Sequence, residues 1–114
     1  MYRKLQLFLT VLESALSSVL IREEEKVQRP VYYVSLVMRG AETKYPLMEK
    51  FVFSLIVAAR KLKTYFEAYP VELITDQPLR KILENPSRSG RIVKWAIELS
   101  EFDLRYTART SIKA

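Results

Sequence analysis

Two acidic residues occupy backbone positions that suit a metal-dependent reaction. Glu49 lies in the first turn of the long apolar segment after Pro46, which favours a helix, and Asp76 directly follows the apolar segment 71–75, which favours a strand. Carboxylate oxygens are the ligands that Mg²⁺ prefers, and paired metal ions assist hydrolysis. Carboxylates at a helix start and at a strand end therefore predict the chemistry of a Mg²⁺-dependent nuclease, with Glu49 and Asp76 as catalytic metal ligands.

Each acid also has a simpler explanation when it is considered by itself. The helix macrodipole favours an acidic residue such as Glu49 in a first helical turn. Asp76 could cap the short helix that is predicted after Pro78. The metal-site interpretation therefore depends on the two residues acting together.

The composition excludes most other catalytic chemistry. The chain contains no histidine and no cysteine. This excludes Ser-His and Cys-His nucleophiles, imidazole and thiolate metal sites, and disulfide bonds. Any catalysis must use carboxylates, hydroxyls, lysine or tyrosine, and carboxylates with Mg²⁺ are the natural choice among these.

The charge balance favours a polyanionic partner. The chain has 19 Lys and Arg against 13 Asp and Glu, a net charge of +6. A basic domain favours nucleic acid as a partner, although charges scattered in this way also suit an ordinary solvated surface. The candidates for phosphate contacts are the basic residues around the polar segment 85–90, namely Arg80, Lys81, Arg88 and Arg91.

The length and hydrophobicity indicate one globular domain. The chain has 114 residues, of which 49% are hydrophobic, enough for a single core. Its first residues lack the apolar run of a signal peptide, and no apolar stretch approaches the ~20 residues that span a bilayer. We therefore expect a soluble intracellular protein, cytoplasmic or nuclear, with no membrane partner.

Hydrophobic periodicity predicts the elements that must position the two acids. We expect strands at 5–11, 17–22, 31–36, 71–75 and 101–106, and helices at 47–65, 78–84 and 91–99. Short connections, one of them the charged segment 23–26, make the first three strands an antiparallel meander. The strand-helix-strand step that follows implies a parallel pairing. The predicted fold class is α/β, with a mixed five-stranded sheet.

Aromatic residues allow two finer predictions. Trp95 stands at helical spacing with Ile92 and Leu99, which favours a place in the core over a contact with nucleic acid. Neighbouring residues of a strand point to opposite faces. We therefore expect one of Tyr32 and Tyr33 to be in the core and the other at the surface.

Several motifs in a fixed order give the chain a family resemblance. They are VYYVS at 31–35, GAETKYP at 40–46, AARKL at 58–62, TDQPLR at 75–80 and GRIVKWAIEL at 90–99. With them the chain resembles the RNase H-like domain of Ty3/gypsy-type retrotransposon polyproteins, plant elements above all, from about residue 5 to the end. The resemblance implies a ribonuclease H-like fold in which three antiparallel strands are followed by a helix, a strand, two helices and a strand.

The resemblance also implies an active site built from acidic residues. The family has an Asp at the end of the first strand, a Glu on the long helix, an Asp at the end of the fourth strand and an acid on a C-terminal helix. These positions fall on Thr10, on Glu49, on Asp76 and beyond Ala114. We therefore expect a single domain over residues 1–114 that lacks the family's C-terminal helix.

Thr10 is the departure that matters most for function. A threonine hydroxyl is neutral and a poor ligand for Mg²⁺, so we expect weak metal binding and little or no cleavage. Glu13 lies nearby, but in an extended strand it would face away from the side of residue 10, and only a bulge or an early turn could change that. It is therefore not expected to replace the missing carboxylate.

The resemblance implies a retrotransposon-derived RNase H-like domain associated with reverse transcriptase. The leading hypothesis is a catalytically degenerate, structural or nucleic-acid-binding module that needs no cofactor. Its partners would be an RNA–DNA hybrid or other nucleic acid and the reverse transcriptase domain of the same polyprotein. The alternative is an active Mg²⁺-dependent endonuclease that cuts the RNA strand of RNA–DNA hybrids. A third hypothesis is a basic binding domain of a domesticated gene.

Overall fold

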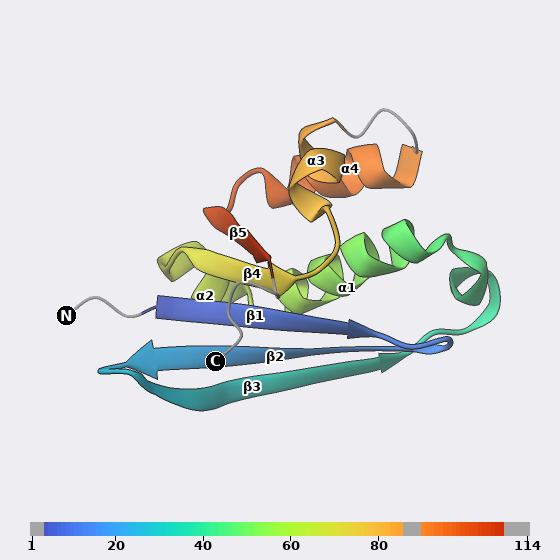
Figure 1. Cartoon of the computed structure of the whole chain (residues 1–114). Coiled ribbons are helices and arrows are strands. Elements are labelled where there is room, and N and C mark those ends of the chain that lie inside the picture. The colour runs from blue at the N-terminus through green and yellow to red at the C-terminus, as the bar shows by residue number, and fades with distance from the viewer. Residues whose placement is uncertain (1–3, 86–89, 109–114) are drawn as a thin grey trace.

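A single mixed sheet forms the centre of the fold (Figure 1). This computed structural model describes residues 4–85 and 90–108, and within them five strands have the spatial order β3-β2-β1-β4-β5. The strands are β1 (Lys4–Val11), β2 (Ala15–Glu24), β3 (Val27–Val37), β4 (Val71–Thr75) and β5 (Leu104–Ala108). The helices are η1 (Gly40–Lys44), α1 (Leu47–Lys61), α2 (Lys63–Ala68), α3 (Leu79–Glu84) and α4 (Gly90–Leu99).

The pairing of the strands confirms the predicted topology. β1 pairs with β2 and β2 with β3 in antiparallel fashion, whereas β1 pairs with β4 and β4 with β5 in parallel. A parallel pair places the carboxyl ends of both strands at the same edge of the sheet. The ends of β1 and β4, which carry the candidate site positions, therefore lie next to each other.

In the hairpin between β2 and β3 the strands are longer and the turn is shorter than predicted. Glu23 and Glu24 belong to β2, and only Glu25 and Lys26 form the turn, both with positive φ (52° and 68°). Two such residues suit a two-residue hairpin because this turn matches the twist of the strands. β3 also extends through Pro30, next to a register shift between Leu20 and Ile21. An outermost strand tolerates the missing N–H of proline.

Replacing Lys26 by glycine should raise the free energy of unfolding by about 0.5–1 kcal/mol. Lys26 has a left-handed backbone, which costs a residue with a Cβ atom about 1–2 kcal/mol, and the larger entropy of an unfolded glycine offsets part of the gain. Urea denaturation measures the change. The control Lys61→Gly at the end of α1 should have the opposite sign. A loss of stability in both variants would contradict the expectation.

The apolar core lies between the sheet and α1. Leu5, Leu7 and Leu9 alternate along β1 and are buried, as are Leu55 and Ile56 of α1. α1 contacts β1, β2 and α4. The predicted single helix over 47–65 is wrong at its end, because Leu62 leaves helical geometry (φ −112°, ψ 31°) and separates α1 from α2.

The last strand begins later than predicted. β5 starts at Leu104, not at residue 101. The N–H of Phe102 donates to the carbonyl of Leu99 (3.1 Å) and the N–H of Val71 donates to the carbonyl of Asp103 (3.0 Å). Phe102 also packs against Phe66 (5.6 Å between ring centroids). Residues 101–103 therefore close the turn after α4 although their polar-apolar alternation resembles a strand.

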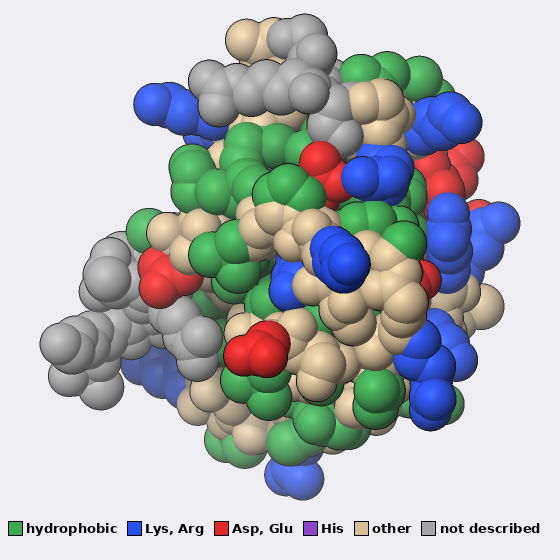
Figure 2. Space-filling view, turned by 90° about the vertical axis from the view of Figure 1, so that its right-hand side faces the viewer, with side chains coloured by type: hydrophobic (Ala, Val, Ile, Leu, Met, Phe, Trp, Pro, Cys, Tyr) green, Lys and Arg blue, Asp and Glu red, His purple; other side chains and the backbone are tan. Residues whose placement is uncertain are grey.

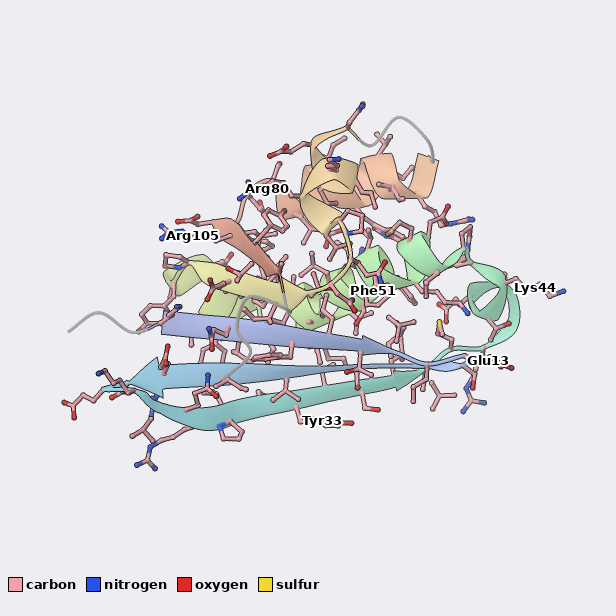
Figure 3. All side chains as sticks on the ribbon, in the orientation of Figure 1. Glu13, Tyr33, Lys44, Phe51, Arg80 and Arg105 are labelled. Atoms are coloured by element: carbon pink, nitrogen blue, oxygen red, sulfur yellow. The ribbon has the colours of Figure 1, made fainter. Side chains whose placement is uncertain are left out.

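Of the two predictions for the aromatic residues, one is confirmed and one is wrong. Trp95 is buried and stacks on Phe53 (5.5 Å between centroids, 21° between planes), which confirms its place in the core. The prediction for the tyrosine pair is wrong, because Tyr32 and Tyr33 are both exposed, at 54% and 62%. β3 is an outer strand of the sheet, and Tyr33 projects from it (Figure 3). Among the helices within the described ranges, none is long and apolar enough to cross a membrane.

Candidate active site

Thr10 and Asp76 stand at the neighbouring ends of two parallel strands. The register between β1 and β4 pairs Phe8 with Ile74. When that register is continued by two residues, Thr10 lies beside Asp76, and both are exposed. The structure therefore brings two of the positions at which the resemblance implies acidic residues, Thr10 and Asp76, to one place at the carboxyl edge of the sheet.

Asp76 has no capping role in the structure. α3 begins at Leu79 with Pro78 in the N-cap position, and no side chain bonds to this helix start. The side-chain amide of Gln77 donates to Oδ1 of Asp76 at 3.4 Å, and the backbone N–H of Gln77 bonds to Oγ1 of Thr75 (3.1 Å). The capping explanation for Asp76 is therefore wrong, and its carboxylate faces solvent.

Glu49 is buried and paired with a cation from α4. It lies in the first turn of α1 and is 8% exposed. Nε of Arg91 donates to Oε1 of Glu49 at 2.9 Å. The guanidinium of Arg91 also lies over the ring of Tyr45, 4.3 Å from its centroid. The hydrogen bond to Glu49 raises the pKa of Arg91 above its usual range, so this cation stays charged.

Glu13 lies outside β1. It belongs to the turn between β1 and β2, where the N–H of Leu12 donates to the carbonyl of Ala15 (2.8 Å). Figure 3 shows Glu13 at the end of this hairpin. Nζ of Lys50 donates to the backbone carbonyl of Glu13 at 3.0 Å, while the side chain of Glu13 is exposed. Its carboxylate therefore projects from a turn and not from the strand that carries Thr10.

These donors do not fit a two-metal site. Such a site needs several carboxylates, and Mg²⁺ requires near-octahedral oxygen ligands. Thr10 offers a neutral hydroxyl, and the carboxylate of Glu49 already binds Arg91. Over residues 4–85 and 90–108, no cluster of three or more acidic side chains could hold a metal ion.

The predicted phosphate-binding residues separate into different environments. Arg80 and Lys81 are exposed on α3, whereas Arg91 is bound to Glu49 and Arg88 lies outside the described residues. The guanidinium of Arg80 lies 5.5 Å from the ring centroid of Tyr106 on β5. Figure 3 shows Arg80 at this upper part of the molecule.

A pocket connects Arg80 with Asp76. It has a volume of about 250 Å³ and is lined by Asp76, Arg80 and Tyr106, together with the segments 77–79 and 107–108 and Thr75. Burial raises the pKa of Tyr106, and the nearby charge of Glu84 raises it further. The pocket is therefore lined by a cation, a phenol and a carboxylate.

The sequence prediction missed the two tyrosines that position the arginines. Tyr45 precedes α1 and contacts Arg91, and Tyr106 lies under Arg80. A signal existed for Tyr45, because it belongs to the motif 40–46.

Figure 2 views the right-hand side of Figure 1, the side on which β1 ends and α1 begins. It shows Lys and Arg on several parts of this face, with Asp and Glu among them.

The sequence of this chain is similar to that of a known family of domains and of a retroviral type of polyprotein. The model of the family described as RNase H-like domain found in reverse transcriptase matches residues 1–102. The retrovirus-related Pol polyprotein from transposon opus of Drosophila melanogaster is 26% identical over 91 residues, which are 78% of this chain and 9% of that polyprotein. The chain thus spans less than a tenth of that relative.

Solved structures give the same fold. The native prototype foamy virus protease–reverse transcriptase is 19% identical with a TM-score of 0.74, over 93% of this chain and 15% of the viral chain. The foamy viral protease–reverse transcriptase in complex with an RNA/DNA hybrid has a TM-score of 0.70 at 19% identity, over 92% and 15% of the two chains. The likeness confirms the predicted ribonuclease H-like fold. With the match of the family model, the chain belongs to the family of RNase H-like domains found in reverse transcriptases.

Proposed function

We propose that this chain is a catalytically degenerate RNase H-like domain of a retrotransposon polyprotein of the Ty3/gypsy type, from a plant element. It binds nucleic acid and supports the reverse transcriptase domain of the same polyprotein. The observation that carries the loss of catalysis is the site itself, where Thr10 replaces the first acid and Arg91 is bound to Glu49. Hydrolysis by two metal ions would lack both the charge and the free ligands that it needs.

Two further observations support the binding role. The chain has a net charge of +6, which favours association with the phosphate backbone. Arg80 and Lys81 are exposed on α3, and Arg80 lines the pocket that also contains Asp76. The foamy viral relatives, solved with double-stranded DNA and with an RNA/DNA hybrid, suggest which nucleic acids to test.

The purified chain should bind an RNA–DNA hybrid without cutting it. A labelled hybrid is incubated with the chain in Mg²⁺ and then in Mn²⁺, and cleavage is read from the product lengths. Binding is measured by fluorescence anisotropy at several salt concentrations. The slope of log affinity against log salt should become shallower by about 1 when a side chain that binds a phosphate is neutralised, as expected for Arg80→Gln or Lys81→Gln. The matched control is Lys63→Gln on α2, which should leave this slope unchanged.

The variant Thr10→Asp tests whether the missing carboxylate causes the inactivity, and circular dichroism tests whether the chain is folded. If the parent chain is silent and Thr10→Asp cuts even slowly, the lost carboxylate explains the inactivity. If the parent chain cuts and Glu49→Gln abolishes cleavage, the degenerate assignment is wrong. A chain that folds by circular dichroism but neither cuts nor binds would instead favour a structural domain without nucleic-acid contact.

A second candidate is an active endonuclease that cuts the RNA strand of RNA–DNA hybrids with Mg²⁺. The observation that favours it is the exposed carboxylate of Asp76, which caps no helix and lies at the end of β4. Glu49 and Asp76 would then hold the ion. The cleavage experiment decides between the two candidates, because only this one predicts products from the parent chain.

A further inference from the structure

Two ion pairs join α1 to α4 with opposite polarity. Near the start of both helices, Glu49 of α1 accepts from Arg91 of α4 at 2.9 Å. Near their ends, Arg60 of α1 donates to both oxygens of Glu98 of α4 at 2.8 Å. The two helices therefore run side by side in the same direction, as Figure 1 shows.

The two pairs differ in their surroundings. The side chains of Arg60 and Glu98 are 56% and 36% exposed, as in an ordinary surface pair. The side chain of Glu49 is only 11% exposed, while that of Arg91 is 51% exposed. A carboxylate in such an environment needs a cation or hydrogen-bond donors, because burial removes the water that would stabilise its charge.

The guanidinium of Arg91 is held from a second side. The ring of Tyr45 lies 4.3 Å from it, and this ring packs against Phe53 (5.7 Å) and Trp95 (6.1 Å between centroids). A planar guanidinium stacks well on an aromatic face. The core thus provides a rigid wall that keeps the positive charge of Arg91 at Glu49.

We propose that the guanidinium of Arg91 takes the place of a divalent cation at Glu49 and keeps metal ions out. With Thr10 in place of an acid, the site carries one negative charge fewer, and a single positive charge balances Glu49. A metal ion that binds Glu49 would have to break the hydrogen bond to Arg91 and remain beside its positive charge, which repels it. The inference rests on the proposed loss of the first acidic position and adds the group that replaces the metal.

Mn²⁺ binding to variants of the whole chain tests this role. The background is Thr10→Asp, which places a second carboxylate beside Asp76. The free Mn²⁺ signal in electron paramagnetic resonance gives the affinity. Thr10→Asp/Arg91→Gln should bind Mn²⁺ about tenfold more tightly than Thr10→Asp, because a repelling unit charge near the ion is removed. The matched control, Thr10→Asp/Arg60→Gln, loses the same charge from the other ion pair of these helices and should leave the affinity unchanged.

Two results would overturn the inference. One is equal Mn²⁺ affinity with and without Arg91 in the Thr10→Asp background. The other is an equal gain in the Arg60 control, which would assign the effect to net charge alone. If Arg91→Gln does not fold, Arg91→Met replaces it in the same comparison, because its unbranched apolar side chain can keep the packing against Tyr45 while the charge is removed. The same gain over the control is then expected, and no gain would again overturn the inference.

The readout also separates this inference from the proposed function. Hybrid cleavage by the parent chain would contradict the degenerate assignment whatever the Mn²⁺ measurements give. An Mn²⁺ affinity that does not respond to residue 91 would contradict only the role of Arg91. The two failures can therefore be distinguished, one by hybrid cleavage and the other by Mn²⁺ affinity.

Discussion

Replacing Trp95 by alanine should lower the free energy of unfolding by about 3–5 kcal/mol, the usual loss for a large buried aromatic residue. The indole is 9% exposed, stacks on Phe53 at 5.5 Å and lies 6.1 Å from Tyr45. Its removal leaves a cavity between α1 and α4 that these rings can close only in part. Urea denaturation followed by circular dichroism measures the loss.

The same helix provides the control for Trp95. Ile97 is 68% exposed on α4, and Ile97→Ala should change the stability by no more than about 0.5 kcal/mol. The Trp95 variant should also loosen the ring of Tyr45 and with it the contact between this ring and the guanidinium of Arg91. A loss below about 1 kcal/mol for Trp95→Ala would show that the site does not depend on this aromatic wall.

Replacing Glu72 by leucine should lower the free energy of unfolding at neutral pH by about 2–3 kcal/mol, because it leaves the buried side-chain amide of Gln6 without its acceptor and removes the partner of Thr107 and Lys4. Nε2 of Gln6 donates to Oε1 of Glu72 at 2.9 Å, the hydroxyl of Thr107 donates to Oε2, and Nζ of Lys4 lies 3.3 Å from Oε1. Gln6 is only 4% exposed. These bonds join β1, β4 and β5 around one carboxylate.

The contribution of Glu72 should also depend on pH. Burial by itself raises the pKa of this carboxyl, but the hydrogen bonds from Gln6 and Thr107 and the charge of Lys4 outweigh burial and lower the pKa. A lowered folded pKa means stability that is fully present above the unfolded value of about 4.3 and is lost as the pH falls through the folded pKa. The parent chain should therefore lose more stability in acid than Glu72→Leu.

Denaturation at neutral and acidic pH checks this difference. Glu101 is exposed in the turn after α4, and Glu101→Leu serves as the control that should retain the pH dependence of the parent. If the parent and Glu72→Leu lose stability in parallel on acidification, the carboxylate of Glu72 does not carry the acid sensitivity.

The sequence by itself determined the order of the strands and of the main helices, and it pointed to Glu49 and Asp76 as the two candidate acids. Local periodicity and turn residues decide these features, because a residue's immediate neighbours set its backbone preference. The strand at 71–75, the helix start after Pro46 and the burial of Trp95 are all confirmed. Two predicted boundaries are wrong, at Leu62 and at the start of β5, because tertiary contacts override the local pattern there.

Only the tertiary structure decided what each candidate residue contacts. Glu49 and Arg91 are 42 positions apart in the chain, and Gln6 and Glu72 are 66 apart. Patterns of short range carry no information about such pairs. Both tyrosines of β3 are exposed because this strand forms an edge of the sheet, a property of the assembled sheet. The sequence thus named two candidate acids, and the packing of α4 against α1 decided that one of them, Glu49, binds an arginine.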